Sequence, residues 1–521
     1  MYKKQMDSRV NHDGIESRAA KVSLVSGFST ILSVGFQLIS VPICLKYWGE
    51  DTYGSWLALY AAFMLVRSLD TGFVSYVGNK LNNLYHQDKN ALHQHLASAL
   101  AGVVIISSLQ LLIGIAAIFS DGIGLLLGMS SDFATDRRSS LALLILIITW
   151  VLTGSYLGIV HRLLIPTGMM YQAAWWSMGF QVSQFTGIIL AATLNFDMLQ
   201  TSLLFAFVQG SIYLTSAIYI RQKLPVFYPW WRGGIPRTGF KDLSQSMWLA
   251  ASNFIQQGST NGTVILISAL SGPAAVPLFT TVRTLTNLWT NVTNVLTTPL
   301  LPEVVRFHAT GEGRKLLIIS EAYWVIVGTT VNLGVLVTYP LINPLYGYWT
   351  AQAMKLDKLL LCMLLASVVV VNAGGLITLY LSGINSLRIV LVTSATRAVL
   401  SLGGGGFLYY HYGLAGFGVG ILSGELMALL LMGHYFVKRE LSRQNVILPL
   451  RSLLPIIVST VSVLLFLICE GSGFTLAKYL YPVALFTVAT AALWGWKWLE
   501  HGVRSRLVRM IGDMLSRKDS V

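Results

Sequence analysis

Five ionisable side chains lie inside long apolar runs of the sequence, where a charge is costly and usually serves a function. They are Arg67, Asp70, Arg283, Arg397 and Glu425. Arg67 and Asp70 stand three residues apart, so on a helix they share a face and can form an ion pair. Either this pair only fixes the rotation of its helix, or both groups face a hydrated cavity.

A polar stripe begins at Arg283 and continues with an asparagine every three or four residues, so one side of a helix would be polar along most of its length. The apolar run before it carries amide side chains as well. Polar groups on this scale cannot face lipid without a large cost. They must line water, a partner helix or a substrate, and we favour a hydrated cavity. The residues concerned are Asn253, Gln256, Gln257, Arg283, Asn287, Asn291 and Asn294.

Arg397 and Glu425 form the remaining charged set, and they fall in consecutive apolar runs. Two interpretations stay open. The two side chains could pair across adjacent helices in a purely structural contact. Alternatively, Glu425 could titrate and couple the protein to a gradient of protons or sodium ions, with Arg397 as its neighbour.

The composition places these residues in a membrane. The chain has 521 residues, of which 54% are hydrophobic and 11% charged, whereas soluble domains carry about 25% charged residues. The net charge of +14 does not indicate nucleic-acid binding, because Lys and Arg lie almost wholly between apolar runs. Lipid is the expected partner of the apolar surface.

Apolar runs of about 20 residues, the length that crosses a bilayer core, predict an all-α polytopic protein with about fourteen transmembrane helices. The first run is too long for the core of a signal peptide, so we expect an uncleaved first span. The spans are predicted at 20–45, 53–77, 97–119, 141–161, 171–194, 201–220, 247–270, 277–302, 323–345, 359–381, 389–411, 413–436, 452–469 and 479–498.

Orientation follows from the basic residues, which are concentrated in cytoplasmic loops. With the N-terminus inside, every second loop is rich in Lys and Arg, and the alternation stays in phase to the end. Both termini are therefore predicted in the cytoplasm, in a bacterial inner membrane. The outward loops hold only Lys46, Arg137, Arg138, Lys355, Lys358 and Lys478.

A weak internal repeat relates the first six spans to the next six by spacing. It predicts two pseudo-symmetric six-helix lobes around a cavity, followed by two extra helices. The tail has an apolar stripe beside several arginines, which fits an amphipathic helix on an anionic leaflet as well as a solvated tail. The predicted divisions are 1–220 (N-lobe), 221–246 (cytoplasmic loop between lobes), 247–436 (C-lobe), 437–498 (extra spans) and 499–521 (basic tail).

The sequence gives no sign of an enzyme. The loops are too short for a catalytic domain, and phosphate-loop, zinc-protease and paired-cysteine motifs are missing from the sequence. The three cysteines, Cys44, Cys362 and Cys469, are too scattered for a metal site. We expect neither a cofactor nor a metal.

Two stretches near the N-terminus carry a family resemblance. Residues 47–56 read Tyr-Trp-Gly-Glu-Asp-Thr-Tyr-Gly-Ser-Trp, residues 69–73 read Leu-Asp-Thr-Gly-Phe, and residues 79–81 read Asn-Lys-Leu. This pattern resembles the polysaccharide-transporter (Wzx-like) branch of the MOP flippase superfamily. The span count and the repeat resemble the wider superfamily, which includes the MATE-like fold, across nearly the whole chain. Wzx-like proteins more often have twelve spans, so this chain departs from them by two.

The resemblance implies a flippase that moves an undecaprenyl-pyrophosphate-linked oligosaccharide, an O-antigen or exopolysaccharide unit, to the periplasmic leaflet by alternating access. It also implies a cavity between spans one, two, seven and eight, with Arg67 and Arg283 on opposing lobes, and an association with polysaccharide polymerase machinery. Arginine suits a pyrophosphate because its planar fork binds two phosphate oxygens.

Three other functions compete with this interpretation. A flippase for a lipid-linked peptidoglycan precursor would also need a basic cavity. A MATE-type drug or cation antiporter would favour acids in its cavity, and the basic surplus here argues against it. A membrane polymerase or ligase would need a large periplasmic loop, which this sequence does not have.

Overall fold

The computed structural model describes residues 15–85, 88–119, 124, 128, 137–297, 300–384, 386–443 and 450–498. These residues form helices joined by turns, without a strand among them. The predicted basic tail at 499–521 lies outside the described residues. The chain divides into two compact units: unit 1 holds residues 1–280 and 349–353, and unit 2 holds 281–348 and 354–521. The division into two lobes at 220 and 247 remains a prediction.

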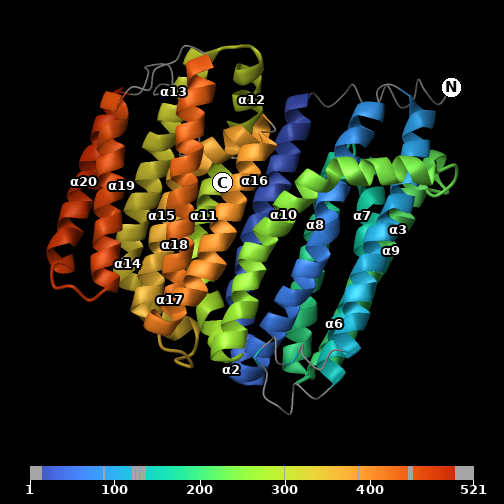
Figure 1. Cartoon of the computed structure of the whole chain (residues 1–521), viewed down its shortest axis with the longest axis horizontal. Helices are drawn as coiled ribbons and strands as arrows, with labels where there is room; N and C mark the ends of the chain where they lie inside the picture. Colours follow the sequence, from blue (N-terminus) through green and yellow to red (C-terminus); the bar gives the residue numbers. More distant parts are fainter. Residues whose placement is uncertain are drawn as a thin grey trace, which may run out of the picture. The chain divides into compact units, whose positions relative to one another are not determined.

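Unit 1 is a helix bundle built around α2, which packs most extensively against α10 and α8. A break at Gly49, whose φ of 72° is accessible to glycine at little cost, separates the first two predicted spans within α2. Figure 1 shows the helices of the unit in blue to green. They are α2 (Ile15–Tyr85), α3 (Lys89–Phe119), α6 (Arg137–Thr149), η1 (Trp150–Ser155), α7 (Tyr156–His161), η2 (Arg162–Leu164), α8 (Met170–Thr193), α9 (Met198–Lys223), η3 (Pro225–Phe227) and α10 (Pro236–Ser271).

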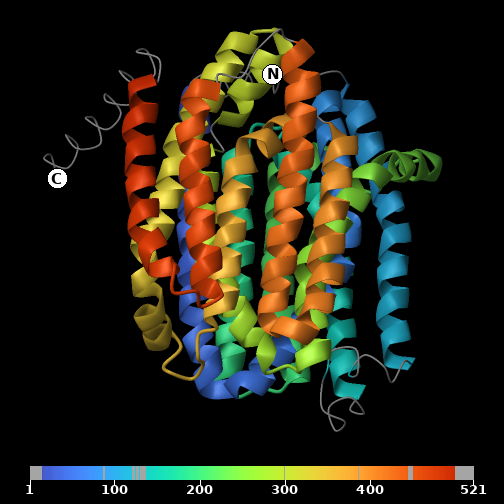
Figure 2. The same ribbon diagram turned by 60° about the vertical axis from the view of Figure 1, so that its left-hand side comes forward.

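Unit 2 has α15 near its centre, where that helix packs against α18 and α19. Its helices are drawn from yellow to red in Figure 1, and α19 and α20 lie side by side in both views (Figures 1 and 2). They are α11 (Ala275–Thr297), which begins in unit 1, α12 (Leu301–Ala309), α13 (Gly313–Tyr323), η5 (Trp324–Gly328), α14 (Thr329–Trp349), α15 (Lys358–Gly383), α16 (Leu387–Ala398), η6 (Val399–Gly404), α17 (Gly405–Tyr412), α18 (Leu414–Tyr435), η7 (Phe436–Leu441), α19 (Leu450–Gly471) and α20 (Ala477–Trp498).

All fourteen predicted spans are helical over the residues that the structure describes, but they are not equally apolar. Ten helical segments in the described part of the chain are long and apolar enough to cross a membrane, and the first of them, Gly27–Tyr85, covers two predicted spans. Helices α8, α10 and α11 fall outside this set. In α10 and α11 the polar stripes explain the lower hydropathy, which fits helices with one face turned away from lipid. The predicted all-α polytopic fold class is confirmed.

The last two helices are fastened to unit 2 by polar contacts as well as apolar packing. Asn332 on α14 donates from Nδ2 to Thr460 Oγ1 on α19 at 3.1 Å. Glu470, at the end of α19, accepts a hydrogen bond from Tyr339 at 3.0 Å and pairs with Lys358 at 2.7 Å. Tyr481 on α20 donates to the Leu336 carbonyl at 3.1 Å. Helices α19 and α20 are thus an integral part of unit 2.

The contact between α2 and α10 depends on the absence of a side chain at Gly72. A Cβ there would lie 2.3 Å from the Cα of Ala250, well inside van der Waals contact. We therefore expect Gly72→Ala to force the two helices apart and to lower the free energy of unfolding by about 1–3 kcal/mol. The melting midpoint of the purified protein in detergent measures this change.

Gly210 on α9 provides the matched control, because nothing lies within 4 Å of the position its Cβ would take. Gly210→Ala should leave the midpoint unchanged or raise it slightly through better helix propensity. Equal midpoints for the two variants would show that the α2–α10 contact is not tight.

Candidate functional site

A cavity of about 350 Å³ lies within unit 1. Its walls come from α2, η1, α7, η2, α8 and α9, so residues far apart in the sequence meet there. The wall is mixed, with charged, hydroxyl and aromatic groups beside small residues. The lining residues are Arg67, Asp70, Thr71, Val74, Ser75, Trp150, Gly154, Gly158, His161, Arg162, Ile165, Ala173, Ser177, Phe180 and Tyr213.

Asp70 is fully buried on α2 and receives its hydrogen bonds from η1. The indole Nε1 of Trp150 donates to Asp70 Oδ2 at 2.8 Å, and the Ser155 hydroxyl donates to the same oxygen. The π-helical form of η1 explains this, because its wider turn brings residues five apart onto one face. The other oxygen, Oδ1, has no hydrogen-bond partner among the described residues.

Arg67 is held by the same indole ring. Its guanidinium carbon lies 3.8 Å from the ring centroid of Trp150, which is cation–π distance. Nη1 also contacts Met64 Sδ at 3.6 Å. Arg67 does not form the ion pair with Asp70 that their spacing allows: within the described residues no carboxylate lies within 4.0 Å of the guanidinium nitrogens. Neutral donors occupy one oxygen of the acid, and Arg67 lines the cavity without contacting the carboxylate.

A second cation, Arg162, lines the cavity from η2. Its stem packs against α2 at Gly78, where a Cβ would come within 2.9 Å of Arg162 Cδ. No acid among the described residues pairs with Arg162 either. Beside it, His161 Nε2 hydrogen-bonds with the Ser216 hydroxyl at 2.8 Å. The cavity therefore holds two guanidinium groups and one carboxylate.

Aromatic rings from α8 and α9 form part of the cavity wall. Phe180 on α8 and Tyr213 on α9 stack with their centroids 4.1 Å apart and their planes within 13°. Trp176 stacks on Phe180, and His161 meets both Phe180 and Tyr213 edge-on. Flat apolar faces of this kind suit the ring faces of sugars or other planar groups.

The predicted site residues of unit 1 do not all meet in this cavity. Arg67 and Asp70 line it, whereas the amides of α10 do not. Gln256 is exposed, and Asn253 and Gln257 are partly buried, with Gln257 Oε1 accepting from Asn261 at 3.0 Å. The middle of α10 thus carries accessible amide side chains, and exposing such polar groups to lipid would be costly.

The predicted residues of unit 2 show two patterns. On α11, Asn287 and Asn294 are exposed, while Arg283 and Asn291 are partly buried. On α16 and α18, Arg397 Nε and Glu425 Oε2 form an ion pair at 2.9 Å, with the two side chains 23% and 17% exposed. The contact across adjacent helices, one of the two interpretations of these residues, is therefore formed. Among the described residues, no three His, Cys, Asp or Glu side chains cluster as metal ligands would.

Four features of the cavity were not predicted from the sequence: Trp150, His161, Arg162 and the π-helical turn. His161 and Arg162 lie at the end of the span predicted at 141–161, so the sequence does not distinguish them from residues at the membrane surface. Trp150 is one of 14 tryptophans in the chain, and nothing in its neighbours marks it as the partner of an acid. The run Gly154–Gly158 is the one signal available, since small residues allow a helix or a ring to approach closely.

Comparison with known proteins identifies the fold. No protein-family model matches the chain, and no curated protein matches it in sequence. Among solved structures, a MATE-family multidrug resistance transporter of the MOP superfamily, inward-facing, aligns with a TM-score of 0.62, 15% identity and 81% of this chain against 99% of the other. The lipid II flippase MurJ, inward closed, aligns with a TM-score of 0.63, 13% identity and coverage of 91% and 97%.

A MOP-superfamily transporter from Pyrococcus furiosus, described as having a binding pocket of reversed polarity, aligns with a TM-score of 0.54, 15% identity and coverage of 81% and 96%. Identities this low establish the fold alone. The chain has the helical fold of MOP-superfamily transporters, and it is a multi-pass membrane protein.

The hydrogen bond between Trp150 and Asp70 can be tested by a double-mutant cycle. Trp150→Phe removes the donor, and we expect it to lower the free energy of unfolding by about 1–3 kcal/mol, because a buried carboxylate loses a partner. In an Asp70→Leu background the same change should cost less, because the acid is already gone. Melting midpoints in detergent report both effects.

Trp494→Phe is the control, since Trp494 is half exposed on α20 and should tolerate the change. If Trp150→Phe costs the same in the presence and absence of Asp70, the hydrogen bond contributes nothing to stability.

Proposed function

We propose that the protein is a flippase of the polysaccharide-transporter (Wzx-like) branch, which moves an undecaprenyl-pyrophosphate-linked oligosaccharide across a bacterial inner membrane by alternating access. The observation that carries this proposal is the charge of the cavity in unit 1. Arg67 and Arg162 line it without an acid partner among the described residues, and Asp70 is engaged by Trp150 and Ser155. An anionic group is the ligand that this arrangement favours.

A pyrophosphate fits the two guanidinium groups. Each can give a forked pair of charge-assisted hydrogen bonds to phosphate oxygens. The guanidinium carbon of Arg67 lies over the Trp150 ring at 3.8 Å from its centroid, and this contact restricts the side chain before a ligand arrives. Preorganised donors of this kind cost less entropy on binding than free side chains do.

The rest of the cavity suits the first sugar of such a substrate. A volume of about 350 Å³ lies at the lower end of ligand sites. It accommodates a headgroup but not a long oligosaccharide. The stacked rings of Phe180 and Tyr213 offer an apolar face to a sugar ring, and Ser177 and Thr71 offer hydroxyls. The accessible amides of α10 are proposed to contact the remaining sugars.

A flippase for a lipid-linked peptidoglycan precursor is the second candidate, favoured by the fold shared with MurJ. Its substrate is also anionic, so the charge of the cavity does not separate the two. A MATE-type cation antiporter is less well supported, because the one acid of the cavity is already hydrogen-bonded by two neutral donors. Competition between purified lipid-linked substrates in a transfer assay separates the candidates.

The proposal also covers the orientation, the partners and the coupling ion of the protein. The protein is taken to act as a transporter and not as an enzyme, with both termini in the cytoplasm. It is proposed to work beside polysaccharide polymerase machinery, and its coupling ion, a proton or sodium ion, is assigned to the Glu425–Arg397 pair. None of these functions requires a cofactor.

Removing either cavity arginine should reduce substrate transfer. We expect Arg67→Ala and Arg162→Ala each to slow transfer of the lipid-linked oligosaccharide in proteoliposomes by about tenfold or more, since a charge-assisted hydrogen bond contributes about 1.5–3 kcal/mol. Arg67→Lys should give an intermediate rate, because it keeps the charge and loses the fork. Arg283→Ala is expected to act in the same direction.

Arg388→Ala, at an exposed position on α16, is the control for loss of one arginine. Protein amount and melting midpoint in each preparation exclude misfolding. Wild-type transfer by both Arg67→Ala and Arg162→Ala would remove the cavity from the proposed mechanism.

The coupling assignment is tested by Glu425→Gln together with Arg397→Gln. The double change removes both charges, so it avoids leaving one buried charge unpaired. We expect transfer driven by a proton or sodium gradient to fall to the rate measured without a gradient, while that basal rate is kept. A gradient response equal to that of the wild type would make the pair structural.

A further inference from the structure

The residues that connect α9 to the upright part of α10 lie across the bundle. We call residues 221–248 the transverse segment. It contains η3 and the first turns of α10, and in Figures 1 and 2 these turns run across the helices of unit 1 instead of along them. Residues 221–246 were predicted to form a loop, but a helix begins at Pro236, and proline is favoured at the first position of a helix.

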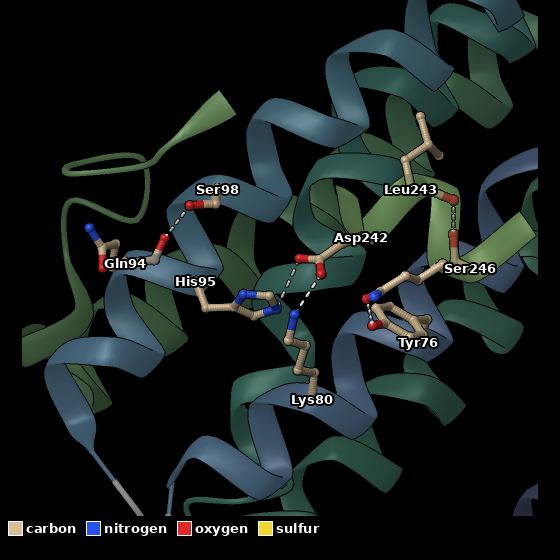
Figure 3. A network of polar contacts seen from close by, with 9 residues as sticks. Tyr76, Lys80, Gln94, His95, Ser98, Asp242, Leu243 and Ser246 are labelled. Atoms are coloured by element: carbon tan, nitrogen blue, oxygen red, sulfur yellow. Dashed lines mark hydrogen bonds and ion pairs between the residues drawn. The ribbon is translucent and has the colours of Figure 1, made fainter. Parts of the chain in front are cut away.

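A charged clamp fixes this segment to the bundle (Figure 3). Asp242 on α10 is fully buried, and its Oδ1 lies 2.6 Å from Lys80 Nζ on α2. Its Oδ2 lies 3.3 Å from His95 Nε2 on α3. One turn further, Gln245 Oε1 accepts a hydrogen bond from the Tyr76 hydroxyl at 2.5 Å. The single acid of the segment is therefore turned inward.

Backbone contacts fix the segment on the other side of the clamp. The amide of Ile235 donates to Ser98 Oγ at 2.8 Å, and His93 Nε2 lies 3.1 Å from the Pro229 carbonyl oxygen. Gly239 touches α3 so closely that a Cβ would lie 2.2 Å from the Ser98 carbonyl oxygen. These contacts hold the inner face of the segment against α2 and α3. The opposite, outer face therefore points away from these helices.

The outer face combines apolar and basic side chains. Its large apolar residues are strongly exposed, with Phe240 62%, Met247 63% and Trp248 67% accessible. Trp231, before α10 in the same segment, is also exposed, at 57%. All the basic residues of the segment are exposed as well, and they are Arg221, Lys223, Arg232, Arg237 and Lys241.

The residues of the clamp lie near helix ends, so the outer face lies at the end of the membrane-crossing bundle. Lys80 lies less than two turns before Tyr85, where α2 ends, and His95 lies less than two turns after Lys89, where α3 begins. The segment therefore runs across the bundle at the level where two spans leave the membrane. Tryptophan and basic residues are enriched at that level of membrane proteins.

We propose that the transverse segment is a binding surface for the headgroups of anionic phospholipids. A basic amphipathic element that lies in the membrane plane binds through its apolar face and through attraction to acidic lipids. The buried Asp242 holds the segment without placing a negative charge on that face. This role is independent of the transported substrate, so it stands or fails separately from the proposed function.

The test measures the affinity of the purified full-length protein for lipid. Phosphatidylglycerol is titrated into the protein in detergent, and the rise of the melting midpoint gives an apparent dissociation constant. We expect a saturable rise with phosphatidylglycerol, and little with phosphatidylcholine or with soluble glycerol phosphate. In the variant Arg232→Gln/Arg237→Gln/Lys241→Gln, the affinity should fall by about tenfold or more, because each cation near an anionic surface contributes roughly fivefold.

Two further variants make the result specific. Arg232→Lys/Arg237→Lys should keep most of the affinity, since a charged surface attracts any cation. Arg137→Gln/Arg314→Gln/Arg388→Gln removes three exposed charges from separate places and should also keep it. The proposal is overturned by an equal response to phosphatidylcholine, by a full response to glycerol phosphate, or by equal losses in the clustered and scattered variants. A large loss in the lysine variant overturns it too, because that would indicate a forked single-ligand site.

Discussion

A carboxylate buried in an apolar helix bundle must receive hydrogen bonds, and the arrangement of unit 1 depends on how Asp70 receives them. Trp150 and Ser155 reach it because η1 is wound as a π-helix, which alters the register of the span that contains it. The ring of Trp150 then lies over Gly154, where a Cβ would meet it at 2.2 Å. The same ring supports the guanidinium of Arg67. One buried acid thus determines where a cation of the cavity lies.

Helix α2 connects the cavity to the transverse segment, and the residues of its sequence motif have separate structural roles. In residues 69–73, Asp70 faces the cavity, Gly72 allows α10 to approach, and Phe73 is fully buried in the core. Further along, Lys80 pairs with Asp242. A displacement of α10 against α2 would therefore strain the Gly72 contact and the clamp together, and it would act on the helix that carries Arg67.

The fold class could be predicted from the sequence because the length and apolarity of a run determine whether it spans a bilayer. The site could be predicted only where partners are close in sequence or on neighbouring spans, as for Arg397 and Glu425. The contact between Arg67 and Asp70 that their spacing allows is not formed, because spacing along a helix says nothing about donors from another helix. The indole and hydroxyl donors reach Asp70 from residues 80 and 85 positions away. The clamp at Asp242 was missed for the same reason.

The two charged sets differ in whether their arginines remain available to bind an anion. In unit 2, Arg397 and Glu425 neutralise each other directly. In unit 1, one oxygen of Asp70 accepts hydrogen bonds from two neutral donors, which add no charge, and neither Arg67 nor Arg162 contacts the carboxylate directly. A cavity walled by apolar rings screens these charges less than water does. An anion that enters gains from both guanidinium groups, whereas a cation is repelled by both and gains only from the single carboxylate of Asp70.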